Sequence, residues 1–427
     1  MEVVSDVLTI ARYLVNSFST TIRVPPEILN IVCSYLTTEE DVFSASQVCH
    51  HWRGVLTSSP SLWTRFSCRR VSWTIASLER CKSIPIQMEV YGRSLSVALE
   101  KVSLRGAKIA SLTISLRSDR IPQLLQLLTS SASSVEQLHI LCEDWEFGEQ
   151  TAHEFWQGLA SLRQLFASEY FIPLDQLRAP NLVHLTLDEP RLRQRVALQS
   201  ILNALRGCPR LETLFISDSC SDYGDLIDDH SLVSLPRLRT IELGPYEVQS
   251  YLVTHLQLPP NIAAGFRMLP ITKIHGAIPL TVVTAMRHVL GRIDIRCITL
   301  AVPPCPQETP DLFIRFEGLQ TSLEITSQAD TYEELREVFF GPRGVLFSHS
   351  PRINNVRELR IIGCPFADGQ VLDHINVAMP NIVSISFFHC EEPHVFVRPP
   401  QPALHHLHFY TSNASWFSDQ NRGWEGW

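Results

Sequence analysis

The sequence lacks most of the features that would place a protein in a class at once. Its 427 residues hold eleven cysteines without a Cys-x-x-Cys pair, and 36 lysine and arginine residues face 44 acidic ones, a formal charge of −8. Binding to nucleic acid or to an anionic membrane surface requires a basic field, so we expect neither partner. Scattered cysteines in odd number are typical of free thiols in a reducing compartment, which predicts a cytoplasmic and/or nuclear protein.

Long apolar runs are also scarce. The charge-free stretch 248–266 approaches membrane length, but His255 and the Pro259-Pro260 pair interrupt it, and we expect no transmembrane span. Charged residues, Glu2 among them, break up any apolar stretch at the start of the chain, which argues against a secretory signal.

Motifs of catalysis are missing as well. The sequence has no glycine-rich phosphate loop, no Gly-x-Ser-x-Gly elbow and no kinase signature. His153-Glu154 begins like a zinc-protease helix, but Gln157 stands where the second histidine is required. The acidic stretch 218–230 fails as a calcium loop because its glycine comes one position late. We therefore expect no enzyme activity, no cofactor and no metal site.

The stretch 24–68 is the most informative part of the chain. Pro25 and Pro26 suit a helix start, and apolar residues then recur at helical spacing up to about Tyr35. Thr37 and Glu40 predict a capping box before a second helix. Further short helices are expected at about 39–48, around Trp52, Val55 and Leu56, and after Pro60. Such a small module buries too little apolar surface to be robust alone, so it needs a partner.

This stretch resembles an F-box. The pattern of that family opens on Leu-Pro, an acidic residue and paired aliphatics, and continues through Asp-Leu, Val-Cys-x-x-Trp and a late Leu-Trp. The matching positions here are Val24-Pro25, Glu27, Ile28-Leu29, Leu36, Asp41-Val42, Val48-Cys49-His50-His51-Trp52 and Leu62-Trp63. Valine in place of the first leucine and a turn one residue longer at 37–40 are the two departures.

The resemblance implies a non-catalytic substrate receptor that docks on the Skp adaptor of a cullin-RING ubiquitin ligase. The residues expected to contact the adaptor are Val24, Pro25, Ile28, Leu29, Val32, Leu36, Trp52, Leu62 and Trp63. For each of them the alternative is a place in the small helical core. The rival function is a scaffolding repeat protein that binds the adaptor without directing ubiquitination of a client.

The rest of the chain repeats a Leu-x-x-Leu-x-Leu-like string. Its apolar positions are Ile109, Leu112, Ile114; Val135, Leu138, Ile140; Leu182, Leu185, Leu187; Leu211, Leu214, Ile216; Leu238, Ile241, Leu243; Ile295, Ile298, Leu300; Val356, Leu359, Ile361; Ile382, Ile385, Phe387; and Leu404, Leu407, Phe409. In five strings proline stands two residues before the first apolar position, where it ends a helix and favours extended chain. One strand and one helix per ~20–29 residues is typical of a leucine-rich repeat.

The expected fold class is α/β: a small helical F-box followed by a leucine-rich-repeat solenoid, a curved parallel sheet with helices on its outer face. This half resembles the irregular leucine-rich repeats of F-box proteins of mushroom-type fungi. The expected segments are a helical extension at 1–23, the F-box at 24–68, a connecting helix and first strand at 69–90, repeats at 91–410 and a tail at 411–427. Helix-like runs lie at 122–129, 196–206 and 332–339, and irregular repeats or an insertion are expected at 162–165, where Ala167 breaks the pattern, and at 246–293.

Strand alternation also predicts a binding face. If the first, fourth and sixth positions of each string are buried, the third, fifth and seventh project onto the concave side of the sheet. We expect a protein client to bind there, with His184, Phe215, Arg360, Phe388, His406, His408 and Tyr410 as the candidate contacts. Aromatic anchors dominate the energetics of interfaces; the alternative is that these rings pack under a neighbouring loop or the tail.

Overall fold

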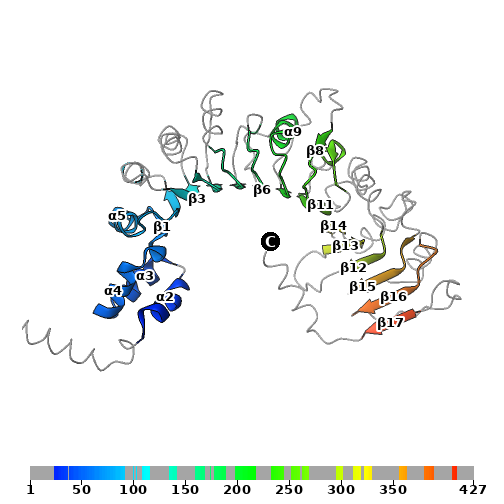
Figure 1. Ribbon diagram of the computed structural model, residues 1–427. Coiled ribbons are helices and arrows are strands. Elements are labelled where there is room, and N and C mark those ends of the chain that lie inside the picture. The colour runs from blue at the N-terminus through cyan, green and yellow to red at the C-terminus, as the bar shows by residue number, and fades with distance from the viewer. Residues whose placement is uncertain are drawn as a thin grey trace, which may run out of the picture. The chain divides into compact units, whose positions relative to one another are not determined.

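The computed structural model of the chain (Figure 1) describes residues 24–36, 38–91, 100, 102, 108–115, 134–141, 159–168, 174, 177–188, 198–217, 232–244, 252–259, 262–268, 295–301, 311–318, 322–328, 355–362, 379–388 and 406–410. Two compact units, Met1–Leu182 and Val183–Trp427, make up the chain. The expected extension at 1–23, the tail at 411–427 and the helix-like runs at 122–129 and 332–339 lie outside the described residues. No helix in the described ranges is long and apolar enough to cross a membrane.

Four short helical elements open the first unit, as the spacing predicts (dark blue in Figure 1). They are α2 (Pro26–Ser34), α3 (Glu39–Ser46), α4 (His50–Ser58) and the 3₁₀ turn η2 (Pro60–Trp63). Thr38 caps α3, because its extended backbone lets Oγ1 accept a hydrogen bond from the Asp41 N–H at 3.1 Å. The cap is therefore one residue later than the capping box expected at Thr37 and Glu40.

The helices share a small core. Leu29 and Cys33 of α2 are each 1% exposed, Leu56 of α4 is fully buried, and Trp63 is 2% exposed. The indole Nε1–H of Trp63 donates a hydrogen bond to the Leu56 carbonyl at 2.8 Å, so the largest buried side chain also has its polar atom satisfied. Burial of each such side chain contributes roughly 1.5–3 kcal/mol.

The helical part continues directly into a sheet. Strand β1 (Arg65–Ser67) pairs in parallel with β2 (Ile86–Tyr91), and α5 (Val71–Arg80) connects them. The connecting helix and first strand expected at 69–90 are thus present. Because the chain has no Gly/Ser-rich hinge at this point and β1 follows η2 after a single residue, the helices and the first strands form one continuous structure.

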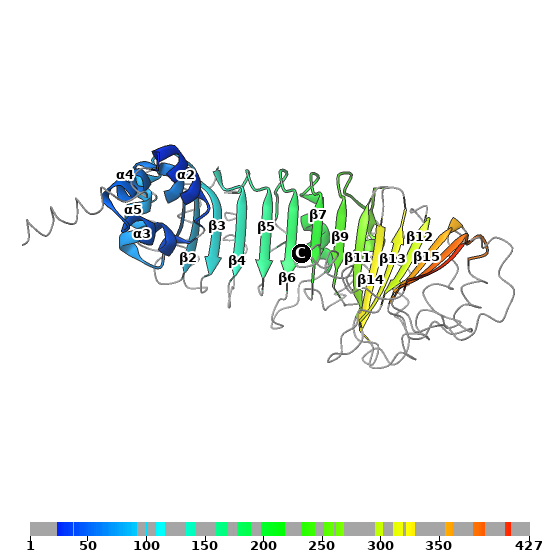
Figure 2. The same ribbon diagram turned by 90° about the horizontal axis from the view of Figure 1, so that it is seen from below.

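Within the first unit the strands stack in parallel in the order of the sequence. Strands β3 (Ile109–Ser115), β4 (Gln137–Leu141) and β5 (Gln164–Ser168) follow β2 (Figure 2). Their apolar positions point into the core: Leu112 and Leu138 are fully buried. The irregularity expected at 162–165 is wrong, because β5 is a regular strand in which Ala167, 4% exposed, takes the place of the larger residue.

The second unit repeats the same construction. Its strand order is β6 (His184–Asp188), β7 (Thr213–Ile216), β9 (Thr240–Leu243), β11 (Ala263–Met268), β14 (Ser322–Gln328), β13 (Asp311–Glu317), β12 (Cys297–Ala301), β15 (Glu358–Ile362), β16 (Ser384–Phe388) and β17 (His406–Tyr410). Each expected string in this unit forms a strand, and stacked parallel strands confirm the solenoid.

An antiparallel pair interrupts the second unit. Strand β14 pairs in parallel with β11, but β13 runs antiparallel to both β14 and β12. The repeat period does not predict these two strands, since Leu312, Ile314 and Phe316 alternate with period two and lack the Leu-x-x-Leu spacing. The pair places two additional strands in the sheet between β11 and β12.

Helices are few among the described residues of the repeats. The expected helix at 196–206 is present as α9 (Leu198–Arg206), whose Ile201 and Leu205 are buried. A small second sheet pairs β8 (Val233–Ser234) with β10 (Leu256–Gln257). Figure 1 shows α9 and β8 on one side of the strands β6 to β11, so the other face of these strands carries the side chains that alternate with the core positions.

Candidate functional site

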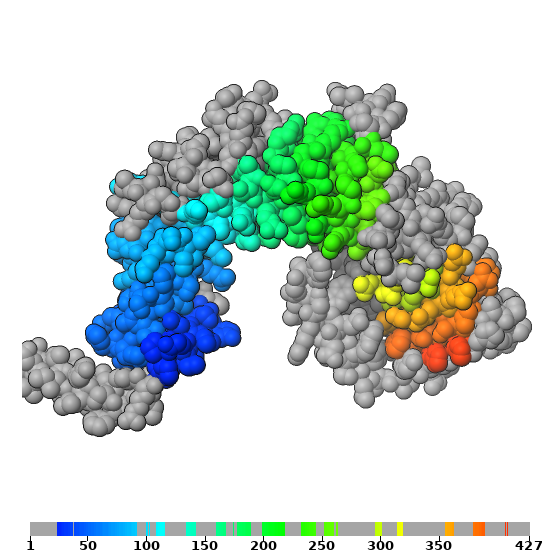
Figure 3. All heavy atoms as spheres, viewed as in Figure 1, coloured from blue at the N-terminus to red at the C-terminus, as the bar shows by residue number. Residues whose placement is uncertain are grey.

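Helix α2 has two apolar faces. Leu29 and Cys33 point into the core, while Ile28, Ile31, Val32 and Tyr35 are exposed by 50, 56, 51 and 79%. The exposed residues follow the spacing i, i+3, i+4, i+7, which places them along one side of a helix. We call these four residues the α2 stripe; they belong to the part of the surface shown in dark blue in Figure 3. Exposed apolar side chains that lie together are typical of interaction sites, so the α2 stripe is the candidate docking surface of this domain.

Aromatic rings connect the helical domain to α5. Trp73 of α5 lies 5.1 Å from Trp63 between ring centroids and meets the edge of Phe43 at 6.0 Å. The guanidinium of Arg80 lies 4.2 Å above the Trp63 ring, a cation–π contact. Phe43 is 51% exposed, so one side of its ring remains open to solvent. These ring contacts pack η2 and α3 against α5. Helix α2 therefore presents its stripe from a packed domain.

The structure divides the residues expected to contact an adaptor. Ile28 and Val32 lie on the α2 stripe and Pro25 is exposed, whereas Val24, Leu36, Trp52 and Leu62 are half-buried. Leu29 and Trp63 are buried in the core. The expectation that these two residues contact the adaptor directly is therefore corrected: they take the alternative place, in the small helical core.

The strand alternation predicted for the second unit is present. The first, fourth and sixth positions of the strings, such as Leu211, Leu214 and Ile216, are buried. His184 is exposed, and Phe215 is half-buried between the register partners Thr186 and Glu242. Two other residues expected to project from the sheet, Ser217 and Ser386, are only 9 and 7% exposed.

The last strands carry the remaining candidates. Phe388 is half-buried, and His406 and His408 are exposed with their rings stacked at 5.9 Å between centroids. Tyr410 ends β17, and its side chain lies outside the described residues. In the described part of the chain no three His, Cys, Asp or Glu residues gather in a way that could hold a metal ion.

The first unit has a ring pair on the corresponding face. His139 of β4 and Phe166 of β5 are register partners and stack at 5.5 Å between centroids. Burial lowers the pKa of His139, because it disfavours the charged form of the ring. The sequence did not predict Phe166 as part of this face, because Ala167 breaks the apolar pattern of the repeat that contains Phe166.

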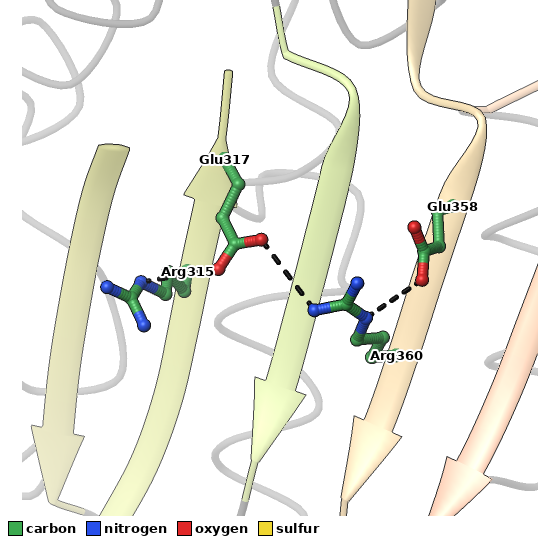
Figure 4. Close-up of polar contacts among 4 residues, drawn as sticks. All are labelled: Arg315, Glu317, Glu358 and Arg360. Carbon is green, nitrogen blue, oxygen red and sulfur yellow. Dashed lines mark hydrogen bonds and ion pairs between the residues drawn. The ribbon is translucent and has the colours of Figure 1, made fainter. Parts of the chain in front are cut away.

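A chain of ion pairs crosses strands β13, β12 and β15 (Figure 4). Glu317 lies 3.5 Å from Arg315 and 3.8 Å from Arg360, and Arg360 Nε donates a hydrogen bond to Glu358 at 2.8 Å. Strand β12 contributes Cys297 between the two glutamates. Burial raises the pKa of the Cys297 thiol to about 11, so this residue adds no charge.

Comparison with known proteins identifies the helical domain. Residues 22–69 match the family described as F-box-like. The chain in this stretch is similar to an F-box. No curated protein matches the chain. Among solved structures, the yeast complex of Rad7 and Elc1 contains a chain with 13% identity and a TM-score of 0.37, over 94% of this chain and 96% of that chain.

The F-box-like domain contains exposed apolar residues that were not among the predicted adaptor contacts. Ile31 and Tyr35 of α2 are more exposed than the predicted Ile28 and Val32, and Val48 is 52% exposed after α3. The signal that indicates Ile31 and Tyr35 was present in the sequence: together with Ile28 and Val32 they form a second helical stripe, offset from the core positions.

The F-box-like domain also holds an unusual carboxylate. Oε1 of Glu39, at the start of α3, is buried without a hydrogen-bond partner in the described structure. Burial, the largest cause, raises the pKa of Glu39 from 4.5 to about 7. The carboxylates of Glu40 and Glu89 contribute to the rise, and the guanidinium groups of Arg70 and Arg69 oppose it.

This carboxylate makes the stability of the domain depend on pH. Between the pKa of an unfolded glutamate and about 7, the folded state retains a proton that the unfolded chain releases. The contribution of protonated Glu39 to the free energy of unfolding is complete below the pKa that Glu39 has in the unfolded chain. It is lost as pH rises through about 7. With Glu39→Gln, we expect the free energy of unfolding to fall less from pH 5.5 to 8, by about 1 kcal/mol after allowance for solvent screening. Urea unfolding at the two pH values measures this, with Glu27→Gln on the exposed side of α2 as control; parallel pH profiles for wild type and Glu39→Gln would refute the assignment.

Proposed function

We propose that the chain is a substrate receptor that docks on the Skp adaptor of a cullin-RING ubiquitin ligase and presents a protein client bound by its repeats. The observation that carries the proposal is the α2 stripe, an exposed apolar helix face within a segment that matches the F-box-like family. A free apolar stripe on a small helical domain is costly in water, and an adaptor subunit that covers it removes that cost.

The docking follows from the geometry of α2. The four residues of the stripe are between one half and four fifths exposed, while Leu29 and Cys33 on the opposite side anchor the helix. Association therefore requires no opening of the core. Each Å² of apolar surface that the adaptor covers contributes roughly 25 cal/mol before the entropic cost of association. Tyr35, the most exposed of the four, is of the residue type enriched at the centres of interfaces.

The receptor needs no catalytic group of its own. Binding of a client to the repeats raises the effective concentration of its lysines near a ubiquitin carrier held by other subunits. The open face of the parallel strands supplies the client surface, because its side chains alternate with the core positions and many are half-buried or exposed. We also propose a cytoplasmic and/or nuclear location, which the free, buried cysteines of the described residues support because thiols remain reduced there.

Protein turnover in cells tests the function. We expect proteins that co-purify with the intact chain to gain half-life when the chain is removed, and to regain turnover when it is restored but not when a variant that cannot bind the adaptor is restored. If the adaptor co-purifies and no bound protein changes its half-life, the scaffolding alternative replaces the receptor.

The client face provides a second prediction. Phe215→Ala and Phe388→Ala remove half-buried rings from the open face of β7 and β16. We expect each substitution to weaken client capture about 10-fold or more, as loss of an aromatic anchor does, with the adaptor still bound. The melting temperature is the control: a fall of more than about 4 °C would show that the rings support the core instead.

A further inference from the structure

The open face of β3, β4 and β5, which lie side by side in the first unit (Figure 2), carries no Asp, Glu, Lys or Arg among its described side chains. Strand β3 contributes only serine and threonine, at positions 111, 113 and 115, and β4 and β5 contribute Gln137, His139, Leu141, Gln164 and Phe166. The apolar residues that alternate with them are at most 4% exposed, so these side chains project together from the other side of the sheet. We call them the uncharged face.

A row of amides crosses this face. Gln137 and Gln164 are register partners, and Ser111 pairs with Gln137 on one side and with Gln87 of β2 on the other. Gln137 and Gln164 are half-buried and Gln87 is exposed. In the part of the chain that the structure describes, no hydrogen bond engages the three side chains. Each amide therefore retains two N–H donors and a carbonyl acceptor, the groups with which a peptide backbone pairs.

An apolar area lies beside the amides. The half-buried rings of His139 and Phe166 stack at 5.5 Å between centroids, and Leu141, two residues after His139 on the same strand, is 39% exposed. Burial lowers the pKa of His139, which favours the uncharged ring. The two rings and the leucine therefore offer a contact for a large apolar side chain.

Charged side chains border the uncharged face. On β2, Glu89 accepts a hydrogen bond from the Tyr91 hydroxyl at 3.0 Å, and the guanidinium of Arg69 lies 4.2 Å above the Tyr91 ring. Exposed charges of both signs, at 108, 136 and 163, stand directly before β3, β4 and β5. A ligand that covers the middle of the face therefore has to bury any charge of its own against uncharged side chains.

We propose that the uncharged face binds an extended, uncharged segment of the client that carries a large apolar side chain. This inference rests on the proposed function, since it names the chemistry of the client that the repeats would capture. A carboxylate or ammonium group buried here would lose its hydration and gain no opposite charge, so charged segments are disfavoured. The amides pair with the backbone of the segment, and the rings with Leu141 contact its apolar side chain. Three strands and the length of β4 measure about 10 by 13 Å, which about four or five extended residues span.

Selection from a displayed library of random peptides on the full chain tests the proposal. Enriched peptides are then labelled and measured by fluorescence anisotropy at about 150 mM salt, where long-range attraction is screened. We expect the enriched peptides to share an uncharged run with a leucine or an aromatic residue. Asp or Lys placed beside that residue should each weaken binding about 10-fold or more. Enrichment of peptides whose shared residues are charged, or no enrichment over a support without the protein, would overturn the proposal.

Charges of both signs at one position locate the binding. Leu141→Asp and Leu141→Lys change a side chain that is 39% exposed, and we expect each to weaken the affinity for an enriched peptide about 10-fold. The matched controls, Leu232→Asp and Leu232→Lys, change a 54% exposed leucine of the second unit and should leave affinity unchanged. If the two changes at Leu141 shift affinity in opposite directions, electrostatic attraction explains the binding and the proposal is wrong. Equal losses at Leu141 and Leu232 would also contradict it.

The ring and the possibility of self-association are tested on the same peptides. Phe166→Ala should weaken binding about 10-fold, as loss of an aromatic anchor does, with circular dichroism to verify the fold. Unchanged affinity in a folded Phe166→Ala protein would overturn the proposal. Sedimentation of the chain without peptide covers the other occupant: a dimer that Leu141→Asp dissociates would show that a second copy occupies the face instead of a client.

The outcome is separable from that of the proposed function. Co-purification of the adaptor does not depend on peptide binding. An adaptor complex whose enriched peptides bind Leu141→Asp and Phe166→Ala as well as the wild type would overturn the uncharged face alone. Peptide binding that depends on Leu141 and Phe166, in a chain that recovers no adaptor, would support the face and contradict the receptor.

Discussion

Ile28→Asp combined with Val32→Asp is expected to abolish co-purification of the adaptor while the chain remains folded. The two side chains are 50 and 51% exposed on the α2 stripe, so carboxylates are tolerated in the free protein. In the complex both charges would be buried against an apolar partner without a counter-ion, which costs several kcal/mol. We expect affinity to fall at least about 100-fold, equivalent to roughly 3 kcal/mol, measured by co-expression followed by quantitative pull-down.

The control for this pair is Leu232→Asp. Leu232 is 54% exposed and lies in the second unit, before β8, so the same change in polarity occurs at the same exposure away from α2. Adaptor recovery should equal that of the wild type. If the double variant still recovers the adaptor at the wild-type level, the α2 stripe is not the docking surface, whatever the melting temperature.

Trp63→Ala is expected to unfold the F-box-like domain or leave it marginal. The indole is 2% exposed, packs against Trp73 and Arg80, and donates a hydrogen bond to the Leu56 carbonyl. Its removal creates a cavity, at a cost of about 3–5 kcal/mol, and leaves the Leu56 carbonyl with only the hydrogen bond from the Ser59 N–H at 3.3 Å. Loss of the near-ultraviolet tryptophan signal and faster proteolysis between 24 and 68 would report the change.

A matched aromatic substitution separates core from surface in the same domain. Tyr35→Ala removes a ring that is 79% exposed, and surface substitutions usually change the free energy of unfolding by less than about 0.5 kcal/mol. We expect normal stability and weakened adaptor binding. Equal destabilisation by Trp63→Ala and Tyr35→Ala would contradict the division of α2 and η2 into core and exposed faces.

The period of the apolar residues was sufficient to predict most of the fold. The Leu-x-x-Leu-x-Leu strings fell on parallel strands because each string buries three residues against its neighbours. It could not predict β13 and β14, since an antiparallel pair alternates with period two and is specified by its partners rather than by the repeat. The apolar period also failed to predict β5 as a regular strand. Ala167 fills a core position there that a larger apolar side chain occupies in the other strings.

The candidate site was predicted less completely than the fold. A family motif marks both core and contact residues, and the sequence alone did not separate buried Leu29 and Trp63 from exposed Ile28 and Val32. Ile31 and Tyr35 fell outside the motif, although their helical spacing was visible. The ion pairs across β13, β12 and β15 depend on which strand lies beside which, and that order is set by the inserted pair.

Hydrogen–deuterium exchange of the intact chain, alone and with the adaptor, measures directly whether a second subunit covers α2. We expect the amides of Pro26–Ser34 and their neighbours in α4 to exchange more slowly in the complex, while β3, β4 and the strands of the second unit exchange as before. Unchanged exchange in α2 with a bound adaptor, or protection confined to the strands, would contradict docking through the helical domain.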